Sequence, residues 1–173
     1  APRPIFSRIR WIDLARGVAL IAMAIYHFAW ALEFFGYLVP GLTAEGAWRL
    51  FARSIASSFL FLVGVSLVLA HAQGIRCRSF LTRLAQVAGS AAAISLVTYL
   101  FIPDGFIFFG ILHQIALASL VGVILRRVPA MVLIPMALVI IAAPYFQRSE
   151  TFDTPWLWWV GLSETIPRAN DYV

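Results

Sequence analysis

Five apolar runs, each close to the length of a bilayer-crossing helix, follow one another along this chain. They lie near residues 12–37, 49–73, 80–102, 107–126 and 129–146. A transmembrane helix needs about 20 predominantly apolar residues, and it satisfies its own backbone polar groups where lipid offers no partner. Only 12% of the residues are charged, against about a quarter in soluble domains. The pattern predicts an all-α, polytopic transmembrane helix bundle of five spans, forming a single domain over residues 1–173.

Short connectors separate the runs. They read LVPGLTAEG, QGIRCRS, IPDGF and RRVP. Connections of this length join antiparallel neighbouring helices and leave no room for a soluble domain. The last stretch, residues 147–173, contains WLWWVGL, which is too short to cross the membrane and is typical of a segment at the outer interface. An odd number of spans, followed by a tail without a terminating motif, leads us to expect that the chain is part of a longer protein.

Arginines and acidic side chains lie on opposite sides of the predicted membrane. The arginine group is Arg3, Arg8, Arg10, Arg76, Arg78, Arg83, Arg126 and Arg127, and the acidic group is Glu45, Asp104, Glu150 and Asp153. Short cytoplasmic loops are enriched in positive charge, so we expect a cytoplasmic N-terminus and a multi-pass protein of the plasma (inner) membrane. The net charge of +5 follows from this topology, and no nucleic-acid partner is expected.

The first run holds two ionisable side chains, Arg16 and, eleven residues later, His27. Eleven steps of about 100° make about three turns, so both project from one helix face, about 16 Å apart along the axis. Asp13 can pair with Arg16 at i,i+3. This pair is either a neutralised anchor at the cytoplasmic boundary or part of a functional site. His27 is likewise either a hydrogen-bonded structural residue or a catalytic one.

A second histidine, His113, lies in the fourth run and is followed by Gln114. Because neighbouring spans alternate in direction, His113 and His27 are expected at similar depth, which indicates a shared site. No Cys/His spacing typical of a metal site occurs, so no metal is expected.

The second run adds a charge and hydroxyl groups to its outer half. Arg53 is followed there by three serines, Ser54, Ser57 and Ser58. Together with the two histidines, these side chains predict an outward-opening polar cavity. Small residues further along, such as Gly64 and Ser66, are expected to serve close helix packing instead.

Three segments carry a resemblance to a known family. They are RIRWIDLARGVALIAMAIYHF in the first run, FLFLVGVSLVLA in the second and FFGILHQIALA in the fourth. Together they resemble the bacterial relatives of heparan-alpha-glucosaminide N-acetyltransferase, within the transmembrane acyltransferase superfamily, over residues 8 to 127. The resemblance implies a membrane-embedded acyltransferase. Its donor would be cytoplasmic acetyl-CoA, and a membrane histidine would pass the acetyl group to a glycan or other envelope acceptor on the outer side.

The resemblance and the residue pattern together assign provisional roles. The candidates are His27 and His113 for catalysis, Arg16 and Asp13 for the donor, and Arg53 and Gln114 for the acceptor side. In this scheme Asp13 orients the Arg16 guanidinium, which attracts the phosphates of CoA. The expected partners are the lipid bilayer, the acyl donor and a glycan-like acceptor, and a homo-oligomer stays open.

Two other functions fit the same residues. Paired imidazoles on antiparallel helices at matching depth are also the ligand set of a membrane b-type haem. The other alternative is a non-enzymatic carrier of an anionic solute, with Arg16, His27 and Arg53 along its path. Carriers commonly contain broken helices near the midplane, and Pro135 in the fifth run is the feature here that resembles one.

Overall fold

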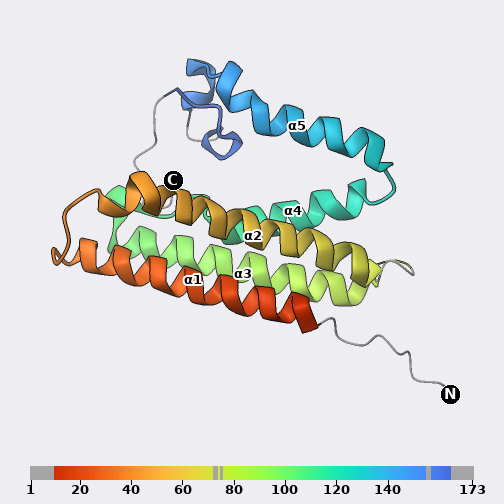
Figure 1. Ribbon diagram of the computed structural model, residues 1–173, viewed down its shortest axis with the longest axis horizontal. Coiled ribbons are helices and arrows are strands. Elements are labelled where there is room, and N and C mark those ends of the chain that lie inside the picture. Colours follow the sequence, from red (N-terminus) through yellow and green to blue (C-terminus); the bar gives the residue numbers. More distant parts are fainter. Residues whose placement is uncertain (1–9, 72–73, 75, 155–156, 165–173) are drawn as a thin grey trace. The chain divides into compact units, whose positions relative to one another are not determined.

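The computed structural model describes residues 10–71, 74, 76–154 and 157–164, and within them every regular element is a helix (Figure 1). The predicted all-α class is therefore confirmed. The chain divides after Leu69 into two compact units, which are described separately below. The predicted topology residues Arg3 and Arg8, and the end of the tail from residue 165, lie outside the described residues.

The first unit contains α1 (Arg10–Phe34), the short 3-10 helix η1 (Leu42–Ala44) and most of α2 (Gly46–His71). Helix α1 ends in a Schellman motif, in which a residue with positive φ turns the chain out of the helix. Gly36 has φ 79° and donates to the Glu33 carbonyl at 2.9 Å, while Tyr37 donates to the Leu32 carbonyl at 2.8 Å. Glycine takes this backbone conformation without steric cost, so the helix stops here.

The connector after α1 is held by hydrogen bonds to one carboxylate, that of Glu33. Glu33 accepts from the Gly41 N–H at 2.6 Å, the Thr43 N–H at 2.8 Å and the Thr43 hydroxyl at 2.7 Å. The Thr43 carbonyl in turn accepts from the Tyr26 hydroxyl at 3.3 Å. Thr43 is only 2% exposed. These bonds give the connector a defined path next to the end of α1.

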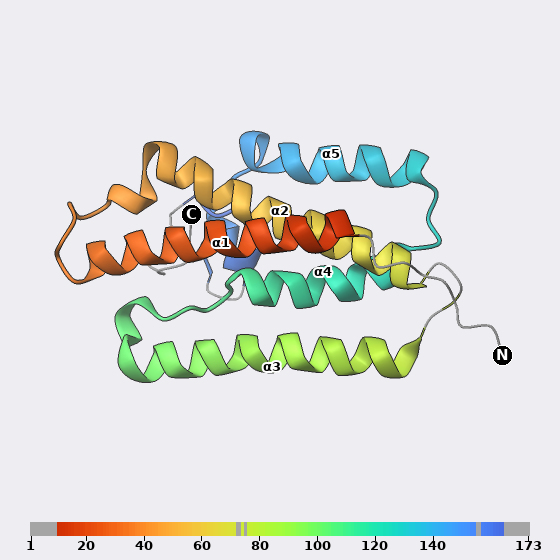
Figure 2. The same ribbon diagram turned by 60° about the horizontal axis from the view of Figure 1, so that its bottom comes forward.

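The second unit begins at Ala70 and contains three further α-helices and three short 3-10 helices. These are α3 (Cys77–Phe101), η2 (Pro103–Gly105), α4 (Ile111–Leu125), α5 (Ala130–Phe146), η3 (Glu150–Asp153) and η4 (Trp158–Val160). Helices α3 and α4 pack side by side and run antiparallel, which Figure 2 shows clearly. Pro103 ends α3, because the residue before a proline is pushed out of the helical conformation.

Helix α4 starts at Ile111, four residues later than the run predicted from 107. The reason is a pair of bonds to α3. The Ile107 N–H donates to the Thr98 hydroxyl at 3.0 Å, and the Ile107 carbonyl accepts from the Ser95 hydroxyl at 2.7 Å. With its backbone groups engaged on α3, Ile107 does not join the helix that follows.

Large apolar side chains point outward from the helices of both units. Phe101 is 79% exposed, Met131 88% and Phe146 85%, whereas the buried residues are small, such as Ala91 at 1%. This inverts the usual order of a soluble domain, in which large apolar side chains fill the interior. An apolar exterior matches a lipid environment.

Three helices among the described residues are long and apolar enough to cross a membrane. They are α1, α2 and α3, with mean hydropathies of 1.6, 1.9 and 1.6. Helices α4 and α5 occupy the fourth and fifth predicted positions but have only 15 and 17 residues. At about 1.5 Å per residue, α4 is shorter than a hydrocarbon core of about 30 Å. Membrane crossing by α4 and α5, and the side on which the N-terminus lies, stay predictions.

The tail after α5 forms two short 3-10 helices held by Asp153. Its side chain accepts from the Ser163 hydroxyl at 2.6 Å and the Glu164 N–H at 2.8 Å, and its carbonyl accepts from the Trp158 indole at 2.8 Å. The described part of the tail contains no helix of spanning length. Its location at the outer interface stays a prediction.

Candidate functional site

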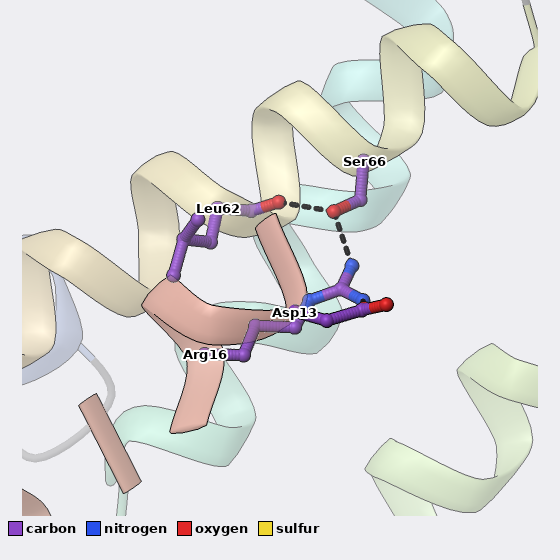
Figure 3. Close-up of polar contacts among 4 residues, drawn as sticks. All are labelled: Asp13, Arg16, Leu62 and Ser66. Atoms are coloured by element: carbon purple, nitrogen blue, oxygen red, sulfur yellow. Dashed lines mark hydrogen bonds and ion pairs between the residues drawn. The ribbon is translucent and has the colours of Figure 1, made fainter. Parts of the chain in front are cut away.

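The predicted pair of Asp13 and Arg16 is present in the first unit, and it has a third member. Arg16 Nη1 lies 3.4 Å from Asp13 Oδ1, while Nη2 donates to the hydroxyl of Ser66 on α2. Figure 3 shows Ser66 between the guanidinium and the Leu62 carbonyl, to which its hydroxyl donates. Ser66 is 8% exposed. Arg16 thereby links α1 to α2.

The Arg16 guanidinium keeps donors for a further partner. One of its five N–H groups points to Asp13 and one to Ser66, and the other three have no partner among the residues that the structure describes. Its side chain is 37% exposed and that of Asp13 54%. An oriented, partly exposed guanidinium is suited to bind an anionic group such as a phosphate. The arrangement is therefore compatible with both interpretations of the pair, the anchor and the donor site.

The role of Ser66 was missed by sequence reasoning, which treated it as a packing residue. Its hydroxyl is the buried partner of the Arg16 guanidinium. The available indication was a small hydroxyl residue in an otherwise apolar run, but 50 positions separate it from Arg16. No local pattern connects two residues so far apart.

His27 stands on α1, on the same continuous helix as Arg16. Its Nδ1 lies 2.9 Å from the Met23 carbonyl. Because a carbonyl only accepts, Nδ1 must carry a proton, and in the neutral ring Nε2 then holds the lone pair. The imidazole is exposed and meets Tyr26 edge-on, at 5.9 Å between ring centroids. In the neutral form of the ring, His27 therefore presents the Nε2 lone pair outward from the helix.

His113 lies in the first turn of α4 in the second unit, against α3. Its Nε2 is 3.3 Å from the Ser95 hydroxyl, and its ring tilts over Phe109 at 5.6 Å between centroids. Nδ1 is buried and has no hydrogen-bond partner within the described residues. Ser95 did not emerge from the sequence, because it is one of many small residues in its run. The shared site of the two histidines stays a prediction.

The remaining predicted residues are on the surface of their helices. Arg53 and Gln114 are both exposed, and the described residues include no side-chain hydrogen bond or ion pair for either. The hydroxyls of Ser54 and Ser58 donate to the carbonyls of Leu50 and Ser54, one turn back on α2, at 2.8 and 2.7 Å. Their protons are thus used within their own helix, and the predicted polar cavity stays a prediction.

A groove lies at the start of α3. Its arginines served in the sequence analysis only to assign the cytoplasmic side of the membrane. The groove is open, has a volume of about 850 Å³ and is lined by Arg76, Arg78 and Arg83, with hydroxyl and amide side chains between them. No acidic residue lines it. Three guanidinium groups around one groove favour a phosphate-bearing ligand or surface. Among the described residues, no three His, Cys, Asp or Glu side chains come together as metal ligands.

Comparison with known proteins extends the sequence resemblance beyond the motifs that carried it. The family described as heparan-alpha-glucosaminide N-acetyltransferase, catalytic, matches residues 8–173. No curated protein and no solved structure matches the chain. The family match spans α1 to α5 and the tail, and α1, α2 and α3 have the length and hydropathy of membrane spans. The chain therefore belongs to the family of heparan-alpha-glucosaminide N-acetyltransferase catalytic domains, as a membrane protein of the acetyltransferase type.

Proposed function

We propose that this protein transfers an acetyl group from cytoplasmic acetyl-CoA to a glycan or other hydroxyl or amine acceptor on the outer side of the plasma membrane. The observation that carries the proposal is His27. In a chain of this acetyltransferase family, its Nδ1 is held by the Met23 carbonyl, which leaves Nε2 as the nitrogen that carries the lone pair when the ring is neutral. A neutral imidazole with one free lone pair is the form that acts as general base or nucleophile in acyl transfer.

The reaction breaks the thioester C–S bond of acetyl-CoA and forms a C–O or C–N bond to the acceptor. The acceptor hydroxyl or amine loses a proton, which His27 Nε2 takes up, and the departing CoA sulfur is protonated to the thiol. If the acetyl group is first carried by the imidazole, Nε2 attacks the thioester carbon and the acceptor attacks the acetyl-imidazole in a second step. Both routes need the same free nitrogen.

The donor side of the proposal is supported by arginines near the ends of helices predicted to face the cytoplasm. Within the described part of the chain, Arg16 keeps three N–H donors without a partner, and it lies on the helix that carries His27. The groove lined by Arg76, Arg78 and Arg83 offers further cationic groups. CoA carries several phosphate charges, which guanidinium groups bind through paired, charge-assisted hydrogen bonds. On the acceptor side we place His113, with Gln114 and Arg53 as further candidates.

The test is acetyl transfer by the purified, full-length protein in detergent. Radiolabelled acetyl-CoA is added with and without an amino sugar, and CoA release and label on the protein are followed. We expect His27→Ala to abolish release and Arg16→Ala to raise the KM for acetyl-CoA. His71→Gln is the matched control, since it removes a histidine at the far end of α2 that the proposal does not use.

Two outcomes would contradict the proposal. The first is equal CoA release by the wild type and His27→Ala, with both proteins monodisperse. The second is that the wild type neither binds nor turns over acetyl-CoA, yet takes up an anionic solute into vesicles without it. That second result would favour the carrier.

A further inference from the structure

Two hydroxyl side chains of α3 hold the backbone that leads into α4. Ser95 donates to the Ile107 carbonyl at 2.7 Å, and Thr98 accepts from the Ile107 N–H at 3.0 Å while donating to the Ile94 carbonyl at 2.8 Å. Only Ser95 also contacts a histidine, His113, whose Nε2 lies 3.3 Å from its oxygen. The bond from Ser95 to Ile107 is enough to fix the backbone before α4. The contact with His113 is not needed for that purpose.

Counting protons assigns the direction of the second bond. A serine hydroxyl has a single proton and two lone pairs, and a carbonyl oxygen only accepts. The bond to Ile107 therefore uses the Ser95 proton, which leaves the oxygen to act as acceptor towards His113. Nε2 must be the donor in that contact, so Nε2 is the protonated nitrogen of the ring.

The other nitrogen, Nδ1, is then defined as well. It is buried, and no hydrogen-bond partner for it occurs within the described residues. A charged imidazole would bury an unpaired N–H at this place, at a large cost in free energy. The neutral ring instead leaves Nδ1 as an unpaired acceptor. Buried polar groups without a partner are rare, and each needs an explanation.

We propose that Ser95 is a positioning residue that holds His113 in the Nε2–H tautomer, so that Nδ1 accepts a hydrogen bond from the hydroxyl or amine of the acceptor substrate. This inference rests on the proposed acetyl transfer and gives His113 a defined atom and partner within it. A hydroxyl or amine that reaches Nδ1 would give this nitrogen the hydrogen-bond donor that it lacks among the described residues. His113 as a whole is half-buried, although its Nδ1 is buried.

The tautomer is tested by NMR, independently of activity. The protein contains three histidines, so ¹⁵N-histidine labelling gives a small spectrum that His27→Gln and His71→Gln variants assign. We expect His113 in the wild type to show the pattern of an Nε2–H tautomer with an unprotonated Nδ1. We expect Ser95→Ala to lose this single pattern and Thr98→Val to keep it. Thr98→Val is the matched control, because it removes the other hydrogen bond to Ile107 but no contact with the histidine.

The role of Nδ1 is tested by acetyl transfer to glucosamine. Ser95→Ala is expected to raise the KM for glucosamine about three- to tenfold, the size of one lost neutral hydrogen bond, with the KM for acetyl-CoA unchanged. His113→Asn places an amide near the position of Nδ1 and His113→Gln near that of Nε2. We therefore expect the asparagine variant to retain more affinity for glucosamine than the glutamine variant.

Several results would overturn the inference. An Nδ1–H tautomer or a charged imidazole for His113 in the wild type refutes the proton assignment. Equal spectra and equal KM values for Ser95→Ala and Thr98→Val would mean that Ser95 only holds the backbone at Ile107. If the wild type releases no CoA at all, the proposed function fails and the acceptor role of Nδ1 fails with it. The spectra of the same samples then still decide whether Ser95 sets the tautomer.

Discussion

Neutralising Glu33 tests whether one carboxylate organises the connector between α1 and α2. Glu33→Gln conserves the shape of the side chain, but its amide end offers an N–H where Gly41 or Thr43 also offers one. At least one of the three hydrogen bonds to the carboxylate is lost, and the others become neutral bonds. Hydrogen bonds to charged groups contribute about 1.5–3 kcal/mol each and neutral ones about 0.5–1.5 kcal/mol. Because Glu33 is half-buried, we expect a net loss of about 2 kcal/mol.

The assay is thermal unfolding in detergent, followed by tryptophan fluorescence. For a chain of this size, about 2 kcal/mol corresponds to a fall in Tm of about 4–8 °C. The matched control is Glu45→Gln, which neutralises an exposed acid of the same connector, and it should shift Tm by less than about 2 °C. Thr43→Val removes only the hydroxyl bond at 2.7 Å, so its effect should be smaller than that of Glu33→Gln.

A double-mutant cycle separates the bond from the residues that make it. The variant carrying both Glu33→Gln and Thr43→Val should be more stable than the sum of the single effects predicts, because both changes remove the same bond. If Glu33→Gln and Glu45→Gln lower Tm equally, the carboxylate does not organise the connector. That result would refute the reasoning even if both variants were destabilised.

Three further predictions concern the membrane and the donor side. Ser66→Ala should lower Tm by about 3–12 °C, because it removes one hydrogen bond to a charged group, worth about 1.5–3 kcal/mol. In acetyl-CoA titrations it should also raise the KM for the donor, because Arg16 is held less firmly, and an unchanged Tm and KM would argue against this link. Cys77, the single cysteine, is exposed. Because its connector is predicted to be cytoplasmic, a membrane-impermeant thiol reagent should label it in inverted vesicles and not in intact cells. Labelling in intact cells would reverse the predicted topology. Arg78→Gln with Arg83→Gln should raise the KM for acetyl-CoA and leave kcat unchanged, and an unchanged KM measured by CoA release would exclude the groove as a donor site.

Local features of the fold followed from the sequence because they depend on neighbouring residues. The length and hydropathy of the apolar runs predicted helices at five positions, since these properties belong to each segment alone. The contact of Asp13 with Arg16 follows from helical periodicity, which brings residues three apart to the same side. Helix ends were predicted less well. Helix α4 begins four residues late because Ile107 is bonded to another helix.

The family resemblance also came from short segments of sequence, and it rested on the Arg16 and His27 pattern with the ILH motif at His113. The match over residues 8–173 confirms the family and reaches past those motifs into the tail. What these segments do not contain is the hydrogen-bond partner of each side chain. A histidine in a motif has two nitrogens, and the motif does not say which of them carries the proton.

The sequence by itself therefore determined the class of protein, the order of its helices and the side chains that are candidates for chemistry. Only the tertiary structure decided that Ser66 receives Arg16 and that Ser95 faces His113, because these partners are 50 and 18 positions apart. The physical reason lies in the range of the interactions. Hydropathy and helical periodicity act along a segment, whereas a hydroxyl selects its partner from whichever helix packs against it, and that packing assigns the proton on His113.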